Sequence, residues 1–238
     1  MNPNTINHPS TSTFFFTVSL VFLIAFVLSP QHTSQAQELQ QGISVHMPST
    51  TGAAQLPAAD HPDAWVVTVT ANGDLYWGVN RVTPESLLET MKSHPGSRSH
   101  ELYIKADGSA QFPSVRRALE TSREDGFHRI FLLTEQSSGR PSGEIVPPFG
   151  MPLWIVPPST EGGLVVQVRP GQGSRSLKVE NEEVRLNQLQ QKLTQLLQNR
   201  SNRVVVLRVG HVPFADVAHV IDVCNMAGAM PVLDMSPL

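Results

Sequence analysis

The feature that most constrains this chain is an uninterrupted apolar run near its start. Residues 14–28 read FFFTVSLVFLIAFVL, in which Thr17 and Ser19 carry the only polar side-chain atoms. At 1.5 Å per residue, a helix over this run spans roughly 22 Å, less than the ~30 Å hydrocarbon core of a bilayer. Flanking Ser, Thr and Pro residues lengthen the segment to 14–30 at the interfaces. The run therefore predicts a transmembrane helix.

Two other interpretations of the apolar run stay open. Ser34 and Ala36, ahead of Gln37, resemble the small residues of a signal-peptide cleavage site, although the positively charged start of a standard signal peptide is absent. A buried soluble helix is the third interpretation, and the lack of an amphipathic pattern around the run argues against it. No Lys or Arg precedes Arg81, so charge bias predicts no orientation. An anchor and a cleaved signal would both export the rest of the chain.

Composition limits the classes of protein to which the 238-residue chain can belong. Hydrophobic residues make up 40% of it, which is enough for a core and excludes a wholly disordered chain. Lys and Arg number 17 against 20 Asp and Glu, so the basic stripe of a nucleic-acid partner is missing. The single cysteine, Cys224, excludes an internal disulfide framework, and its place on an apolar helix face predicts a small buried residue. No pair among the nine histidines has metal-ligand spacing, so we expect no metal and no cofactor.

The chain beyond the apolar run shows the same order of predicted elements twice. Residues 66–69 alternate like a strand, and residues 165–168 do so 99 positions later. Asn72-Gly73 is a hairpin signal that makes residues 75–77 a return strand. The elements that follow also occur once in each copy. They are a helix from Thr83-Pro84 or from Leu186, and then a strand over 102–105 or 205–208. A helix containing Val115 or Val217 comes next, and a last strand over 130–133 or 232–233 ends each copy. The helices around Val115 and Val217 have apolar residues at i, i+3, i+4 and i+7, and both end at a glycine, Gly126 or Gly228.

This repetition predicts an α+β fold with two tandem small domains after the membrane helix. Each domain is expected to have a mixed sheet of about five strands with two helices on one face, and parallel strands around each helix. The predicted segments are a tail (1–13), the transmembrane or signal helix (14–30), a linker (31–41), the first domain (42–137), a Pro/Gly-rich linker (138–151) and the second domain (152–238).

The layout resembles the ExbD/TolR family of biopolymer transport proteins, which have one N-terminal transmembrane helix and a small periplasmic α+β domain. The resemblance is carried by residues 66–91, VVTVTANGDLYWGVNRVTPESLLETM, and by residues 102–135, LYIKADGSAQFPSVRRALETSREDGFHRIFLLTE. Asp107, Phe112, Val115 and Gly126 fall where the family has an Asp, an aromatic residue, an apolar residue and the helix-ending glycine. The second copy is a more distant match: Gly210 stands at the Asp position, and Val212-Pro213-Phe214 resembles the family's Val-Pro-Tyr.

The resemblance implies a single-pass protein of the inner (plasma) membrane with its C-terminal domains in the periplasm. It also implies a multi-helix ExbB/TolQ-like channel subunit as partner, with which the family uses the proton gradient to drive work in the periplasm. The family carries a membrane Asp that takes up and releases protons, and here Thr17 stands at that proton-pathway position. No titratable side chain occurs between Pro9 and Gln31. We therefore expect that another subunit supplies the proton step, or that this chain is not a motor.

The expected function is thus that of a membrane-anchored component of an ExbD/TolR-type transport or energy-transduction complex, acting through protein contacts. The alternative is an exported scaffold or binding module, released after signal cleavage and not coupled to proton flow. An enzyme is disfavoured because no acid–base or nucleophile set can be assembled. A predicted leading strand, residues 43–47, stands far from its domain and could pair with its own sheet or a neighbour's. The chain is accordingly expected to form a homodimer, or to be an intrachain pseudo-dimer in which the second copy replaces the neighbour.

Overall fold

The computed structural model describes residues 42–94, 101–136, 148–156, 159–171 and 175–236. Within these ranges, no helix combines the length and the apolar character that crossing a bilayer requires. The predicted transmembrane segment 14–30, with Thr17, lies outside the described residues, as do the tail 1–13, the linker 31–41 and most of the linker 138–151.

Two stretches of the chain, the first half (residues 65–136) and the second half (residues 164–233), contain the same succession of elements. The first half comprises β3 (Trp65–Val69), β4 (Leu75–Trp77), β5 (Asn80–Val82), α2 (Pro84–Ser93), β6 (Leu102–Ala106), α3 (Phe112–Glu124) and β7 (Arg129–Gln136). The second half comprises β9 (Leu164–Pro170), β10 (Arg175–Val179), β11 (Glu182–Glu183), α4 (Leu186–Leu197), β12 (Val204–Val209), α5 (Phe214–Met226) and β13 (Met230–Leu233). The hairpin strands are antiparallel, and the strands flanking α3 and α5 are parallel. The predicted α+β class with a mixed sheet is confirmed.

Strand β8 (Phe149–Trp154) joins the two halves into one sheet. It pairs antiparallel with β7, and it pairs in parallel with β13 where Trp154 lies opposite Val232. The strand order is β11-β10-β9-β12-β13-β8-β7-β6-β3-β4-β5. The described residues thus form one continuous sheet where two sheets were predicted, and β8 begins inside the range predicted as a linker. Insertion of β8 gives hydrogen-bond partners to β7 and β13, which would otherwise be open sheet edges.

Residues 42–60, the lead-in segment, precede the first half. They contain β1 (Ser49–Thr50), β2 (Ala54–Gln55) and a 3₁₀ helix, η1 (Pro57–Asp60). Strand β1 pairs in parallel with the end of β7, and β2 pairs antiparallel with β8. The strand predicted over the described residues 43–47 is not formed. Pro48 has no amide to donate, and the amide of His46 donates to a side chain, so ladder pairing begins only at Ser49.

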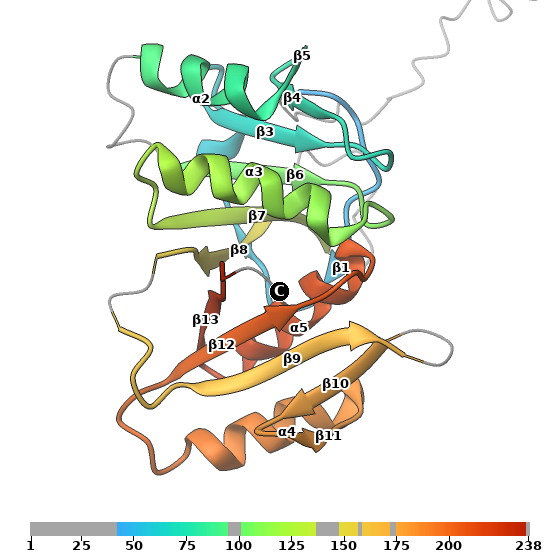
Figure 1. Ribbon diagram of the computed structural model, residues 1–238, viewed down its shortest axis with the longest axis vertical. Helices are drawn as coiled ribbons and strands as arrows, with labels where there is room; N and C mark the ends of the chain where they lie inside the picture. The colour runs from blue at the N-terminus through green and yellow to red at the C-terminus, as the bar shows by residue number, and fades with distance from the viewer. Residues whose placement is uncertain (1–41, 95–100, 137–147, 157–158, 172–174, 237–238) are drawn as a thin grey trace, which may run out of the picture. The chain divides into compact units, whose positions relative to one another are not determined.

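The α-helices of the described residues pack against one face of the sheet and enclose a common core. Leu87, Val115, Leu193 and Val220, one from each α-helix, belong to the same buried cluster. In Figure 1, α2 and α3 lie in front of their strands, whereas β12 lies in front of α5. Strand twist accumulates across the sheet, so the helix-bearing face turns from the viewer's side to the far side.

The predicted helix boundaries are confirmed by their local structure. Thr83 caps α2: its hydroxyl accepts the Ser86 amide at 3.2 Å, and the Ser86 hydroxyl accepts the Thr83 amide at 2.8 Å. Gly126 follows α3 with φ +99°, and Gly228 follows α5 with φ +68°. These angles lie in the left-handed region, where a residue with a side chain is strained.

Candidate functional site

The two halves meet at the turns that precede α3 and α5. Phe112, the first residue of α3, donates its amide to the carbonyl of Val212 at 2.9 Å, and Phe214, the first residue of α5, donates to the carbonyl of Ala110 at 2.8 Å. Phe214 stands 102 positions after Phe112, and Val212 stands 102 positions after Ala110. Each hydrogen bond is therefore the counterpart of the other. Reciprocal pairs of this kind characterise an interface related by two-fold symmetry.

This seam, formed by residues 110–112 and 212–214, has a buried apolar side and an exposed side that carries Gln111 and Pro213. Gln111 and Pro213 face each other across an antiparallel bridge at its centre. The side chains of Ala110, Phe112, Val212 and Phe214 are at most 1% exposed. The seam therefore fixes the two halves by backbone hydrogen bonds and by burial of aromatic surface, without a charged group.

A buried carboxylate, Asp107, fastens the start of the lead-in segment to the end of β6. Its Oδ1 accepts the amide of Ser109 at 2.9 Å and the hydroxyl of Ser109 at 2.6 Å, and its Oδ2 accepts the amide of His46 at 3.1 Å. Burial raises the pKa of Asp107, but the hydrogen bonds from Ser109 and His46 outweigh it and hold the pKa below its ordinary value. Asp107 is therefore ionised at neutral pH and acts as a fixed acceptor.

A second buried carboxylate, Asp222 of α5, fastens the middle of the same segment. Its Oδ2 accepts the amide of Thr51 at 2.9 Å and the hydroxyl of Thr51 at 3.2 Å, and its Oδ1 accepts the amide of Gly52 at 2.9 Å. Nε2 of His219 lies 3.1 Å from the carbonyl of Ser49. A Cβ on Gly52 would lie 3.0 Å from Oδ1 of Asp222, so glycine permits this close approach. The lead-in segment is thus held by one carboxylate from each half.

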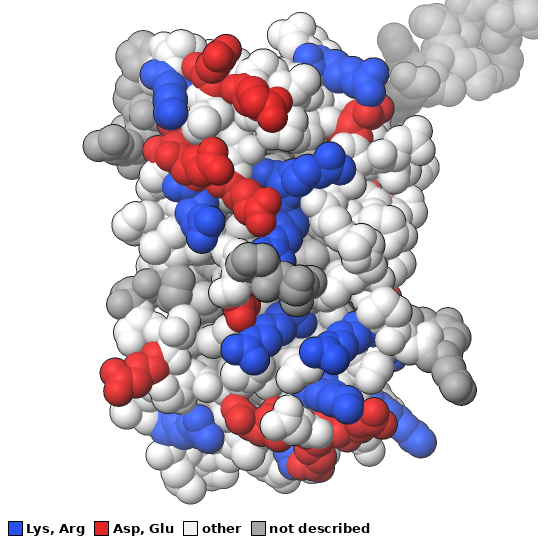
Figure 2. Space-filling model, in the orientation of Figure 1, with Lys and Arg blue, Asp and Glu red and all other residues white. Residues whose placement is uncertain are grey.

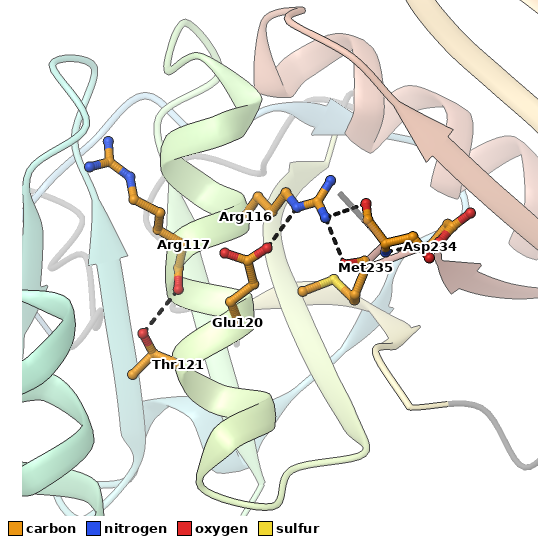
Figure 3. Close-up of polar contacts among 7 residues, drawn as sticks. Arg116, Arg117, Glu120, Thr121, Asp234 and Met235 are labelled. Atoms are coloured by element: carbon orange, nitrogen blue, oxygen red, sulfur yellow. Dashed lines mark hydrogen bonds and ion pairs between the residues drawn. The ribbon is translucent and has the colours of Figure 1, made fainter. Parts of the chain in front are cut away.

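Arg116 of α3 binds the residues that follow the second half (Figure 3). Its Nη2 donates to the carbonyls of Met235 and Ser236, each at 2.7 Å, and its Nε donates to Glu120 at 2.8 Å. Arg117, the next residue, points away from this contact. The Arg116 side chain is only 14% exposed, so the first half and the chain end are joined by a largely desolvated guanidinium.

The residues singled out from the sequence divide between the seam and the core. Phe112 lies at the seam, Asp107 holds the lead-in segment, and Val115 is fully buried in the common core. Gly210 occupies the place of Asp107 in the second half, which therefore has no carboxylate there. Thr17 lies outside the described residues.

Two functional contacts were missed by sequence reasoning. Asp222 carried a usable signal, since it is an acidic residue between Ile221 and Val223 on a predicted apolar helix. Arg116 carried none, because an arginine on a helix is ordinarily a solvated residue.

Metal-ligating and nucleophilic side chains are the groups on which bond chemistry by the described residues would depend. Within them, no group of three or more His, Cys, Asp or Glu side chains could hold a metal ion. Cys224 lies in the core as its helical spacing predicted, and burial raises the pKa of its thiol to about 12. A thiol with that pKa is protonated and unreactive at neutral pH. The arrangement of Asp107, Asp222 and Arg116 fastens backbone segments to one another.

The described residues form a small α+β unit whose segments are fastened by buried polar side chains, and this fold is compatible with one known protein family. The family described as Biopolymer transport protein ExbD/TolR matches residues 15–137, from the apolar run to the end of β7. This range is more than half of the chain, and the chain belongs to the ExbD/TolR family. The second half lies beyond the matched range. Neither the curated proteins nor the solved structures that were compared contain a match.

Membership indicates a component of biopolymer transport or energy transduction. The family consists of non-enzymatic, transport-associated proteins that are generally anchored in the inner membrane with a periplasmic domain, and that generally work with ExbB/TolQ-like partners.

Proposed function

We propose that this chain is a membrane-anchored periplasmic component of an ExbD/TolR-type energy-transduction complex, and that it acts by protein contacts and catalyses no reaction. Residues 14–30 serve as its single-pass anchor, and residues 42–137 and 152–238 form its periplasmic units. The observation that carries this proposal is the family match, which covers residues 15–137, from the apolar run through the first half. The expected partner is an ExbB/TolQ-like membrane subunit.

In this proposal, the chain does not take up and release the proton by itself. Thr17, at the position where the resemblance places the family's membrane Asp, has a hydroxyl that does not ionise at cellular pH. A carboxylate within a membrane costs about 2.5–3.5 kcal/mol and persists where it is used, so its replacement by Thr removes the titrating group. Another subunit of the complex supplies that group.

The second half takes the place of a neighbouring copy, which makes the chain an intrachain pseudo-dimer. Three observations support this proposal: the same strand order in both halves, the reciprocal hydrogen bonds of the seam, and a lead-in segment held by both Asp107 and Asp222. A pseudo-dimer needs one membrane anchor for two periplasmic units.

The proposal is tested on the full chain in its native membrane. We expect the protein to stay in the membrane after alkaline extraction, to have an intact N-terminus by mass spectrometry, and to crosslink to a multi-helix membrane subunit. A mature N-terminus near Gln37 in a protein extracted without detergent would instead identify a released periplasmic module. The Thr17→Asp substitution is expected to make the complex more sensitive to a proton uncoupler. The Ser19→Asp substitution, two residues along the run, is not expected to change that sensitivity.

A further inference from the structure

Large exposed hydrophobic side chains are rare on the described part of the chain. They are Val79, at the turn between β4 and β5, and Met226, the last residue of α5. Figure 2 shows acidic and basic side chains interspersed over the visible face, so charge of one sign does not mark a binding surface there. A single exposed apolar residue is ordinary by itself. Met226 differs because of the groups that it contacts.

Met226 lies against the attachment between the lead-in segment and α5. Asp222 precedes it by four positions on the helix, so both side chains project from the same face of α5. The Thr51 hydroxyl lies 3.4 Å from Sδ of Met226 and 3.2 Å from Oδ2 of Asp222. A Cβ on Gly52 would lie 2.6 Å from Cγ of Met226, so the thioether side chain packs directly over that glycine. The thioether is therefore one wall of the site that holds Thr51 and Gly52.

The Thr51 hydroxyl has one proton and two acceptors beside it. Carboxylate oxygen is a strong acceptor and thioether sulfur is a weak one, so the proton is directed mainly to Asp222. The sulfur of an unmodified Met226 therefore leaves the attachment undisturbed. An oxygen atom on that sulfur would change the balance, because methionine sulfoxide is polar where the thioether is apolar.

Met226 is also the methionine that an oxidant reaches most easily among the described residues. Its exposed fraction is 38%, and Met230 is partly buried. The other four described methionines are at most 8% exposed: Met47, Met91, Met151 and Met235. Cys224, two positions before Met226, is fully buried, so its thiol does not compete for the oxidant.

From these contacts we propose that Met226 is an oxidation site whose sulfoxide releases Thr51 and Gly52 from Asp222. The oxidant is hydrogen peroxide. Its O–O bond breaks, one oxygen forms the S–O bond of the sulfoxide, and the other leaves as water with both hydrogens. The sulfur loses two electrons and the peroxide gains them. The new oxygen competes for the Thr51 proton, repels the Asp222 carboxylate and adds bulk above Gly52.

The consequence is a lead-in segment that the second half holds less tightly. The pairing of β1 with β7 and the bond from His46 to Asp107 remain, so the segment keeps its attachment to the first half. On the side of the second half, the contact between His219 and the Ser49 carbonyl also remains. Oxidation therefore loosens the middle of the segment and leaves the rest in place. This inference is independent of the anchor and the proton step.

The test uses the full chain in detergent and hydrogen peroxide as the oxidant. Peptide mapping by mass spectrometry is expected to show that Met226 is oxidised about tenfold faster than Met91 and Met151, in keeping with its exposure. Hydrogen exchange at the Thr51 and Gly52 amides should then become about fivefold faster, the change expected when one hydrogen-bonded attachment weakens. Treatment with a methionine sulfoxide reductase should restore slow exchange.

Three variants separate oxidation from packing. Met226→Leu, which keeps the apolar volume and cannot form a sulfoxide, should show slow exchange at Thr51 and Gly52 before and after peroxide. Met230→Leu is the matched control, because it removes a partly buried methionine nearby in the sequence, and it should leave the peroxide effect unchanged. In Asp222→Ala the attachment is already lost, so peroxide should not accelerate exchange further.

Oxidation of Met226 at the same rate as Met91 and Met151 would overturn the inference. Unchanged exchange at the Thr51 and Gly52 amides, in a chain whose Met226 is fully oxidised, would overturn it as well. A peroxide effect that persists in a folded Met226→Leu variant would assign the change to another residue and reject Met226 as the site.

Discussion

Replacing Asp222 with alanine should detach the lead-in segment from the second half. The carboxylate accepts the amides of Thr51 and Gly52 and the hydroxyl of Thr51, at 2.9, 2.9 and 3.2 Å. Asp222 itself is 5% exposed and comes from α5, more than 160 residues away in the chain. Its removal therefore deletes a long-range attachment and leaves the secondary structure of α5 intact.

The size of the effect follows from the exposure of the donors. A hydrogen bond to a charged group contributes about 1.5–3 kcal/mol when it is shielded. Thr51 and Gly52 are exposed, so water replaces much of what their amides lose. We therefore expect Asp222→Ala to lower the free energy of unfolding by about 2–3 kcal/mol in total. That corresponds to a fall in Tm of about 4–12 °C for a chain of this size.

The assay combines thermal unfolding of the full chain in detergent with hydrogen exchange. Asp222→Ala should lower Tm and accelerate exchange of the Thr51 and Gly52 amides, while Asp222→Asn, which keeps one oxygen acceptor, should have about half the effect. Glu89→Ala, an exposed residue on α2, is the control. An unchanged Tm, or a lower Tm without faster exchange at these two amides, would refute the attachment.

Three further predictions concern Asp107, Arg116 and Cys224. The pKa of Asp107 in the folded chain lies below its ordinary value of 3.8. Its contribution to stability is therefore complete above pH 3.8 and is lost as the pH falls through the folded-state pKa. Asp107→Asn should flatten this part of an acid-unfolding curve. Arg116→Met should lower the free energy of unfolding by about 1–2 kcal/mol in denaturant titrations and speed carboxypeptidase digestion, because two backbone carbonyls lose their donor. Cys224 should resist maleimide in the folded chain and react after denaturation, because its thiol is buried and protonated.

Each of these has an outcome that contradicts it. Parallel acid-unfolding curves for the native chain and Asp107→Asn would show that the carboxylate's hydrogen bonds do not favour its ionised form. If Arg116→Lys, which keeps the charge but not the two-carbonyl geometry, matched the native chain, the bonds to Met235 and Ser236 would be unimportant. Rapid labelling of Cys224 in the folded chain would contradict its burial.

Local patterns predicted the elements of both halves well. The alternation of residues 66–69 and 165–168 lies within β3 and β9, and Thr83 and Gly126 lie at the ends of α2 and α3 as their residue types indicated. These predictions depend on the nearest few residues, whose capping groups and side-chain periodicity act over one or two turns. The same patterns failed at residues 43–47, which alternate like a strand but pair with no other strand. The amide of His46 donates instead to the side chain of Asp107, which is distant in the sequence, and ladder pairing begins at Ser49.

The amino-acid order alone determined the apolar run, the absence of titratable groups within it, and the repeated succession of strands and helices. Only the tertiary structure decided that β8 merges the two halves into one sheet, that the seam pairs Phe112 with Val212 and Phe214 with Ala110, and that Asp107 and Asp222 hold two different points of the lead-in segment. The physical reason is that helix ends and strand alternation arise from neighbouring residues. Sheet edges and buried carboxylates find partners only where the folded chain brings unsatisfied backbone groups together.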